Sequence, residues 1–499
     1  MKTFHAGWML WCILSIATLA FGQSATTSLG RAVKDSSGAL VQGATITLAD
    51  QATDNKYHAV SNGSSFYVFP IIEPARYLIT ITSKGFATET RTAELLVDQP
   101  ATLDFTLSVK SDAVTVDLSS AAETLDFTDA TMGNSVVNTT IEALPMDGRN
   151  PINLLSLQPG VLYMGSEVVD SRQGAVSGRR SDQGNITLDG LDDNDQIFGT
   201  AFTGILRSTL DSTEEFRVTT SNGTAASGRS SGAQINLVTR SGTNHYHGAL
   251  YEYYRPDNVV ANQYFLKYNE VSTPNTPNVP PFYLVNTFGG ALGAPIMKDK
   301  LFYFFNYEGQ RIATRDVATA TVPTPAFMGG GLNYVDASTG NTDTLTPAQV
   351  AATDHPCTAN TFNGSPVCPN GPGANAAVLK YLVAEPTTLS TIGGDGGLNS
   401  GEIVFSSPAP ATLNTSILKI DYTMNSKNHF FARGNLQKDT TAGDENFPGQ
   451  PAAIFYDDNT KGMSFGHTWI PTAHIVNDAR YGYVRQGWQN GGIAPRHMG

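Results

Sequence analysis

The chain has 499 residues, a formal net charge of -13 and only 15% charged residues. This length is enough for two or three domains with sizeable cores. The share of charged residues is well below the roughly 25% of an average soluble domain, which suits a secreted or outer-membrane protein better than a cytosolic enzyme. We expect no nucleic-acid partner, because binding nucleic acid needs a concentrated basic face.

Residues 1–22 have the features of a secretory signal peptide. Lys2 precedes an apolar run over residues 8–21, and the small residues Ala20 and Gly22 mark a cleavage site, expected after Gly22. The run is too short for a spanning helix, which needs about 20 residues. No other stretch could form such a helix, so a membrane location would require a β-barrel.

Residues 25–108 form short alternating runs, such as ATITLAD and RYLITITS, separated by turn residues. This spacing predicts a small antiparallel β-sandwich. The segment resembles the carboxypeptidase-regulatory-like, transthyretin-like family at Gly30, Val33, Asp35, Gly38, Gly43, Ala44, Tyr77, Gly85 and Phe86. Ser65 and Ala75 stand where that family usually has glycine, so we expect these two turns to be altered. The resemblance implies no active site in this domain. Carbohydrate binding is sometimes associated with the fold, but no residue here points to it specifically.

Residues 109–125 read as a polar linker with an extended stretch at Val114, Thr115 and Val116. One interpretation is an edge strand that adds to the sheet of another protein, where backbone pairing supplies the affinity. The other is the last strand of the sandwich, or simply an ordered linker. Three alternating residues do not decide between them.

Residues 126–243 show an α+β pattern. A short amphipathic helix is predicted over residues 151–157, closed by Pro159 and Gly160. A strand with an Asp189-Gly190 turn follows. The strands EEFRVTTS and AQINLVTR then flank a glycine-rich turn, and a domain boundary is expected near residues 241–244.

Several separate motifs resemble TonB-dependent outer-membrane receptors, most closely the Oar-like subgroup with an N-terminal carboxypeptidase-regulatory-like domain. The matching positions near the end of the α+β segment are Glu214, Glu215, Phe216, Arg217, Val218, Gly228, Gly232, Asn236, Val238, Thr239, Arg240, Ser241, Gly242, Thr243, Asn244, His247 and Gly248. Earlier positions also match, at Leu144, Pro145, Gly148, Arg149, Leu154, Leu155, Pro159, Gly160, Val161, Gly178, Arg180, Asn185, Leu188, Asp189, Gly190 and Asn194.

The resemblance implies a plug domain at 126–243 inside a transmembrane β-barrel. It makes Val114, Thr115 and Val116 a candidate TonB box for a TonB-type energy-coupling protein. The expected surroundings are outer-membrane lipid and an extracellular ligand. Saccharide, peptide, siderophore and protein remain open as that ligand, and no cofactor is implied.

Neither catalysis nor a metal site is expected. Three patterns could suggest one: Gly228, Ser230 and Gly232 as a G-x-S-x-G string, the cluster of Asp189, Asp192, Asp193 and Asp195, and the pair of His245 and His247. A nucleophile elbow needs a strand before its serine and a helix after it, and this string has neither. The aspartates lack EF-hand spacing, and the histidines lack an evident third zinc ligand.

Residues 244–499 read as strands of about ten residues, the outer-membrane pattern. LFYFFNYEGQR, SILKIDYTM and NHFFARGNLQ each alternate apolar with polar side chains, and a tight turn is predicted over residues 425–428. The apolar residues would face lipid and the polar ones the lumen. A soluble sandwich with one wet face has the same period. The barrel is favoured because long polar segments alternate with tight turns after the plug motif.

Residues 312–413 form the largest non-periodic segment, predicted as a long extracellular loop. It holds Cys357 and Cys368. An even pair in an exported chain predicts one local disulfide, with two unpaired thiols as the alternative.

The predicted fold class is therefore mainly β: an N-terminal β-sandwich, an α+β plug domain and antiparallel transmembrane β-barrel strands. About seven strand candidates lie after residue 244, whereas the smallest bacterial barrels need eight. An incomplete barrel is expected, from the N-terminal part of a longer receptor. The predicted function is an outer-membrane TonB-dependent receptor or transporter for a bulky ligand. The alternative is a surface adhesion or structural protein without active transport, and a working TonB box would separate the two.

Overall fold

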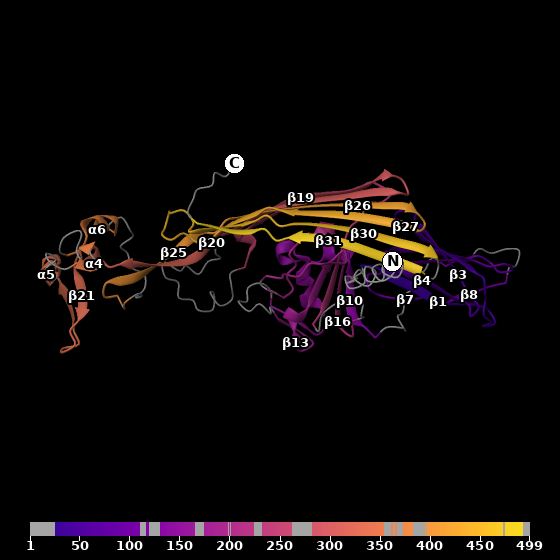
Figure 1. Cartoon of the computed structure of the whole chain (residues 1–499), viewed down its shortest axis with the longest axis horizontal. Helices are drawn as coiled ribbons and strands as arrows, with labels where there is room; N and C mark the ends of the chain where they lie inside the picture. The colour runs from indigo at the N-terminus through magenta and orange to yellow at the C-terminus, as the bar shows by residue number, and fades with distance from the viewer. Residues whose placement is uncertain are drawn as a thin grey trace, which may run out of the picture.

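A computed structural model describes residues 25–109, 116–118, 130–164, 174–197, 199, 201–223, 232–261, 282–353, 361–362, 365–366, 373–382, 395, 397–472 and 475–492. The described chain is mainly β, as predicted, and has four parts: a sandwich domain, an inner domain, a wall sheet and a distal lobe (Figure 1). The sandwich domain and the lobe lie at opposite ends of the molecule in Figure 1, with the inner domain against one face of the wall sheet. The predicted signal peptide, residues 1–22, lies outside the described residues.

The sandwich domain consists of two β-sheets. One has the order β4-β1-β7, with β8 also paired to β1, and the other has the order β3-β2-β5-β6-β9. The strands are β1 (Thr27–Asp35), β2 (Thr45–Asp50), β3 (Lys56–Val60), β4 (Phe66–Ile72), β5 (Ala75–Thr82), β6 (Glu89–Leu95), β7 (Ala101–Thr102), β8 (Phe105–Leu107) and β9 (Val116–Leu118).

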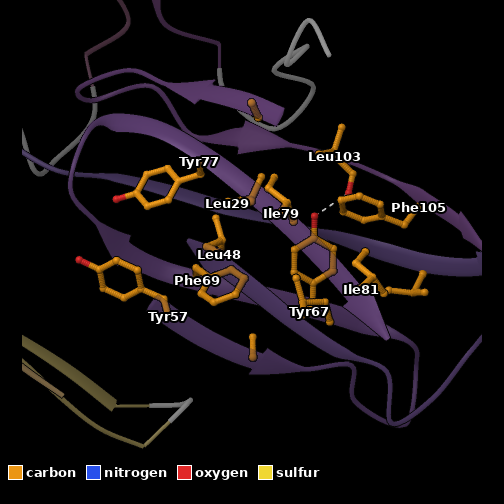
Figure 2. Packing of buried hydrophobic residues seen from close by; sticks show 14 of the residues in the cluster. Leu29, Leu48, Tyr57, Tyr67, Phe69, Tyr77, Ile79, Ile81, Leu103 and Phe105 are labelled. Atoms are coloured by element: carbon orange, nitrogen blue, oxygen red, sulfur yellow. Dashed lines mark hydrogen bonds between the residues drawn. The ribbon is translucent and has the colours of Figure 1, made fainter. Parts of the chain in front are cut away.

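The core between these sheets follows from the two-residue period of its strands. In β4, Tyr67 and Phe69 are buried while Phe66 and Val68 are about half exposed. Figure 2 shows the inward side chains of both sheets packed together, including Leu29, Ile79 and Phe105. The Tyr67 hydroxyl donates to the carbonyl oxygen of Leu103 at 2.7 Å, so this buried phenol is satisfied (Figure 2).

The inner domain is built on a five-stranded sheet with the order β10-β16-β17-β14-β15. Its strands are β10 (Met132–Val137), β14 (Asn185–Leu188), β15 (Leu191–Asp192), β16 (Thr213–Ser221) and β17 (Gln234–Thr239). A separate three-stranded sheet contains β11 (Val161–Tyr163), β12 (Gly174–Val176) and β13 (Arg179–Arg180). The helical turns are α2 (Asn138–Ala143), η1 (Asp147–Arg149), η2 (Pro151–Leu157), η3 (Ser181–Gln183) and η4 (Leu210–Ser212).

Two local predictions for this domain are confirmed. Residues 151–157 are helical, in the tighter 3₁₀ form: Pro151 begins η2 and the Asn150 side chain accepts the N–H of Ile152 at 3.1 Å. Asp189 and Gly190 form the tight turn between β14 and β15, with φ of 51° and 75°. Two successive positive φ angles match the twist of a short hairpin, which explains an Asp-Gly pair here.

The wall sheet continues from the inner domain through antiparallel strands in the order β18-β19-β20-β26-β27-β30-β31. Their bounds are β18 (His247–Pro256), β19 (Tyr283–Met297), β20 (Leu301–Pro323), β26 (Ala411–Asn425), β27 (Asn428–Gln437), β30 (Lys461–Thr472) and β31 (Ile475–Arg485). Four further strands join this sheet: β25 (Ser400–Pro408), β28 (Asp439–Ala442), β29 (Ile454–Asp458) and β32 (Trp488–Gly492). A 3₁₀ turn, η6 (Asp257–Val259), follows β18.

The two faces of the wall sheet differ as the sequence pattern predicts. In β20, Asn306 and Glu308 are buried against the inner domain, whereas Phe305 is 42% exposed on the other face. In β18, Leu250 is 92% exposed on that outer face. The predicted tight turn also forms, since Asn425 pairs with Asn428 between β26 and β27. An apolar outer face and a polar inner face are what a sheet between lipid and a hydrated lumen requires.

The distal lobe shows where strands extend beyond the prediction. Strand β20 runs on to Pro323 and pairs with β25, so both ends of the segment expected to be non-periodic, 312–413, are strands. The sequence interpretation missed them because the two strands of this ladder lie far apart along the chain, with β25 beginning only at Ser400. Between them lie α4 (Pro325–Met328), β21 (Leu332–Val335), β22 (Thr342–Leu345), α5 (Pro347–Thr353), β23 (Thr361–Phe362), β24 (Ser365–Pro366) and α6 (Ala376–Leu382).

The helices of the described residues are all short. None of them combines the length and the apolar character needed to cross a membrane.

Candidate functional site

The two ends of the wall sheet have different neighbours. At one end the strands connect by tight turns, as between β26 and β27, and the sandwich domain lies against these turns. Tyr57 of the sandwich domain stacks on His429 with ring centroids 5.1 Å apart, and Asn244 donates its backbone N–H to Ala52 at 3.0 Å. At the other end β20 and β25 extend into the lobe (Figure 1). We call these the turn end and the lobe end.

The Asp189-Gly190 turn of the inner domain is bound by three wall strands. The Asp189 carboxylate lies 3.1 Å from Arg433 Nε and 3.9 Å from Lys419 Nζ, and Arg480 Nη1 donates to the Asp189 carbonyl oxygen at 2.5 Å. The carboxylate also accepts the N–H and the hydroxyl of Thr239, at 2.8 and 2.7 Å. Burial acts to raise the pKa of Asp189, but the two cations and these hydrogen bonds hold it below its ordinary value. The turn is therefore anchored as a carboxylate.

Arg149 is a second link between the inner domain and the wall. Its guanidinium lies 2.5 Å from Asp211 Oδ2 and 3.3 Å from Glu308 Oε2. The rings of Tyr251 and Tyr253 on β18 stand 4.8 and 4.3 Å from the guanidinium carbon. Two ion pairs and two cation–π contacts together fix the position of this arginine side chain.

Arg207 is a third link, toward the lobe end. It lies 2.5 Å from Asp439 Oδ2 on β28, and its backbone N–H donates to Gln437 Oε1 at 2.5 Å. Asn435 on β27 donates to the Arg207 carbonyl oxygen at 3.0 Å. The inner domain is thus joined to the wall sheet by buried or half-buried polar contacts at several positions between the turn end and the lobe end.

A cavity of about 730 Å³ lies beside Arg207, between the inner domain and the wall. Its inner-domain side includes Asn150, Tyr163, Asp193, Asp195, Phe202 and Gly204, and its wall side includes Gln437, Asp458, Thr460, Gln486 and Trp488. The wall residues stand at the lobe ends of their strands, since β27 begins at the tight turn and ends at Gln437. We call this cavity the chamber. Its size and its mixture of aromatic and polar side chains are those of a ligand site.

Asp193 is the chamber residue with the most unusual surroundings. It is 1% exposed, and its Oδ1 accepts the N–H of Leu206 at 2.9 Å. Its Oδ2 is buried and has no hydrogen-bond partner within the described part of the chain. Burial raises the pKa of Asp193 to about 7.

The sandwich domain bonds to the inner domain as well as to the wall. Arg217 on β16 donates to Gln99 Oε1 at 3.0 Å, and the Glu215 carboxylate accepts the backbone N–H of Val97. The sandwich domain is therefore linked to both of the other parts at the turn end.

The residues singled out as a candidate TonB box lie at the limit of the described structure. Val114 and Thr115 fall outside it, and Val116 begins β9, which pairs in parallel with β6 through Glu89. Cys357 and Cys368 also lie outside the described residues, so their pairing stays a prediction.

The other motif residues do not converge on a reactive centre. Gly228 and Ser230 lie outside the described residues, and the Gly232 N–H bonds to the Gln183 carbonyl oxygen at 3.2 Å. The Asp189 and Asp193 side chains serve different partners, as described above. Across the described ranges, no three His, Cys, Asp or Glu side chains are arranged to hold a metal ion.

Sequence reasoning placed several of these side chains correctly but missed their partners. Lys419, Arg433 and Gln437 were predicted to face the lumen, and all three are buried against the inner side. The chamber and the roles of Asp193 and Arg207 were missed. The available sequence signal was the presence of charged residues at inward-facing strand positions. Such a residue is expected to have a partner, but the sequence does not show which residue that partner is.

A curved wall sheet with an apolar outer face, and an inner domain bonded to its polar face, define a protein of the outer-membrane barrel class. The family described as "Outer membrane beta barrel domain" matches residues 238–497, more than half of the chain, and the chain belongs to that family. The family described as "Carboxypeptidase regulatory-like domain" matches residues 30–108, which lie within the sandwich predicted over residues 25–108. The predicted family resemblance is thereby confirmed.

Over part of its length, the chain is similar to a curated transporter and to solved outer-membrane proteins. The chain is 25% identical over 305 residues to the TonB-dependent transporter Oar of Myxococcus xanthus, which covers 59% of this chain and 27% of that transporter. Among solved structures, the outer membrane transporter YddB from Escherichia coli gives a TM-score of 0.42 at 9% identity, over 71% of this chain and 39% of that one. A mutant ferric enterobactin receptor from Pseudomonas aeruginosa gives 0.37 at 10% identity, over 71% and 41%. The chain thus spans less than half the length of each of these proteins.

Proposed function

We propose that the chain acts as part of an outer-membrane TonB-dependent receptor that takes up a bulky extracellular ligand, with the inner domain as its plug. One observation carries the proposal: the inner domain fills the polar face of the wall through Asp189, Arg149 and Arg207, while the chamber stays at the lobe end. Longer connections of outer-membrane barrels are extracellular and tight turns periplasmic. The chamber would then face the outside and the sandwich domain the periplasm.

The proposed energy coupling uses residues 114–116. Strand β9, which begins at Val116, is the edge strand of its sheet beside β6. A TonB-type protein would pair with this segment through backbone hydrogen bonds, which demand little of the side chains. The proposed partners are therefore outer-membrane lipid, a TonB-type coupling protein and an extracellular ligand.

Backbone pairing can be tested by separating backbone from side-chain effects. Val114→Pro, Thr115→Pro and Val116→Pro together remove three N–H donors, whereas the matched triple alanine variant keeps them. We expect the purified periplasmic domain of a TonB-type protein from the same bacterium to bind the alanine variant and the unaltered chain, and to bind the proline variant at least tenfold more weakly. Equal binding of the two variants would reject coupling through these residues.

The membrane location needs an independent measurement. We expect the exported chain to fractionate with outer membranes and to show a heat-dependent change in gel mobility, the behaviour of a folded barrel wall. A soluble or aggregated chain would contradict the proposal. A membrane-bound chain that fails the coupling test would instead favour the surface adhesion or structural alternative.

A further inference from the structure

The chamber carries unbalanced negative charge. Its charged lining residues are Asp193, Asp195, Asp458 and Arg207. The single cation among them is already neutralised, because both terminal nitrogens of Arg207 bond to the carboxylate of Asp439 at 3.2 and 2.5 Å. The carboxylates of Asp195 and Asp458 therefore set the sign of the potential that a ligand meets, and Asp193 adds to it once it is ionised, above its pKa of about 7.

Asp193 gives this negative chamber a specific acceptor. Its Oδ1 is used by Leu206, but the buried Oδ2 has no hydrogen-bond partner among the described residues. Buried carboxylate oxygens are normally paired, since an unpaired one loses its hydration without compensation. A donor from a ligand would complete the site.

Gly204 packs closely against this oxygen. Gly204 lines the same chamber, and a Cβ atom placed on it would stand 2.4 Å from Asp193 Oδ2. Any larger side chain at this position would press on the acceptor. The position of Oδ2 in the chamber wall thus depends on the absence of a side chain at position 204.

Aromatic rings supply the second element of a cation site. Tyr163 and Phe202 meet edge to face with centroids 5.7 Å apart, and Trp488 stacks on Tyr456 at 5.8 Å. Tyr163, Phe202 and Trp488 line the chamber. Faces of such rings attract ammonium and guanidinium groups.

We propose that the chamber receives a cationic ligand group, a primary ammonium or guanidinium, which donates to Asp193 Oδ2 and lies against the aromatic rings. This inference rests on the proposed function, because it names the ligand class of the same receptor. A volume of about 730 Å³ accommodates the tip of a larger ligand, such as a short basic peptide segment. Polyanionic ligands are disfavoured by the same carboxylates.

The test uses the purified full chain and three probes: trilysine, triglutamate and maltotriose, with binding followed by titration calorimetry. We expect trilysine to bind more tightly than the other two. Asp193→Asn keeps the shape but removes the charge, and should weaken trilysine at least tenfold, the usual scale of a charge-assisted hydrogen bond. Gly204→Ala should weaken it through steric pressure on Oδ2.

The matched control is Asp192→Asn, which changes an exposed neighbour that does not line the chamber and should leave trilysine binding unchanged. Unaltered heat-dependent gel mobility would show that each variant is folded. Equal trilysine affinity in Asp193→Asn and the unaltered chain, or tighter binding of triglutamate or maltotriose, would overturn the proposal. Such a result would leave the coupling test at residues 114–116 unaffected, so failure of the ligand class and failure of the receptor function are distinguishable.

Discussion

The backbone N–H of Val97 lies within hydrogen-bond distance of both carboxylate oxygens of Glu215, 3.0 Å from Oε1 and 2.9 Å from Oε2. Val97 belongs to the sandwich domain and Glu215 to β16 of the inner domain, and both are buried. This contact joins two domains through a titratable group. Burial raises the pKa of Glu215 to about 7, partly opposed by the Val97 N–H.

The first prediction concerns the pH dependence of this contact. Because the folded-state pKa lies above the ordinary 4.5, protonation favours the folded chain, and the stability supplied by Glu215 is lost as pH rises from about 4.5 through about 7. Glu215→Gln is uncharged at every pH, so relative to the unaltered chain it should gain up to about 3 kcal/mol between pH 4.5 and pH 8. Thermal unfolding of both proteins at the two pH values measures this gain.

Glu214→Gln is the control, since the Glu214 side chain is 54% exposed and its replacement should change the stability only slightly. A stability difference for Glu215→Gln that is the same at both pH values would contradict the prediction.

The second prediction concerns the anchored turn. Asp189→Asn tolerates the positive φ of 51° but leaves Arg433, whose side chain is 1% exposed, without its closest counter-ion. We expect a loss of about 3–5 kcal/mol in unfolding free energy, measured by denaturant titration. Adding Arg433→Met should restore much of that loss, because the buried charge is then gone.

Asp182→Asn breaks an exposed pair with Arg180 and should cost about 1 kcal/mol or less. A double variant no more stable than Asp189→Asn would show that the turn is not held through charge.

The third prediction follows from Ser65, which stands where the carboxypeptidase-regulatory-like family usually has glycine. Its φ is 62°, its side chain is fully buried, and its hydroxyl has no hydrogen-bond partner in the described structure. Ser65→Gly removes both the strain of a positive φ at a residue with a side chain and the cost of a buried, unpaired hydroxyl. After the entropy cost of glycine is subtracted, it should stabilise the chain by about 1 kcal/mol. Ser64→Gly, at the exposed neighbouring position without a positive φ, should give no gain in thermal unfolding.

The fourth prediction concerns Cys357 and Cys368. If they form the predicted disulfide, the exported, unreduced chain takes up no alkylating reagent at these positions, and both react after reduction. Mass spectrometry of the segment measures the uptake. Two alkylated thiols without reduction would support the alternative of unpaired cysteines.

The local sequence pattern was sufficient to predict the face on which a side chain lies wherever that face alternates regularly along the strand. The two-residue period of β20, β26 and β27 placed Asn306, Lys419 and Arg433 on the inner face, and Asp189-Gly190 specified its turn through backbone angles alone. The 3₁₀ form of η2 was not predicted, because its apolar spacing also suits an α-helix. The extension of β20 to Pro323 was missed because its partner β25 begins only at Ser400.

The sequence by itself determined the outer-membrane family, the mainly β fold and the faces on which the residues of β20, β26 and β27 lie, because these depend on short motifs and on strand period. Tertiary structure decided which charges meet: Glu215 with Val97, Arg207 with Asp439, and Asp193 with an open chamber. Those partners are separated by more than a hundred residues, or lie on different parts of the fold. Coulombic and hydrogen-bond energies depend on distances of a few ångströms, and only the packed chain sets those distances.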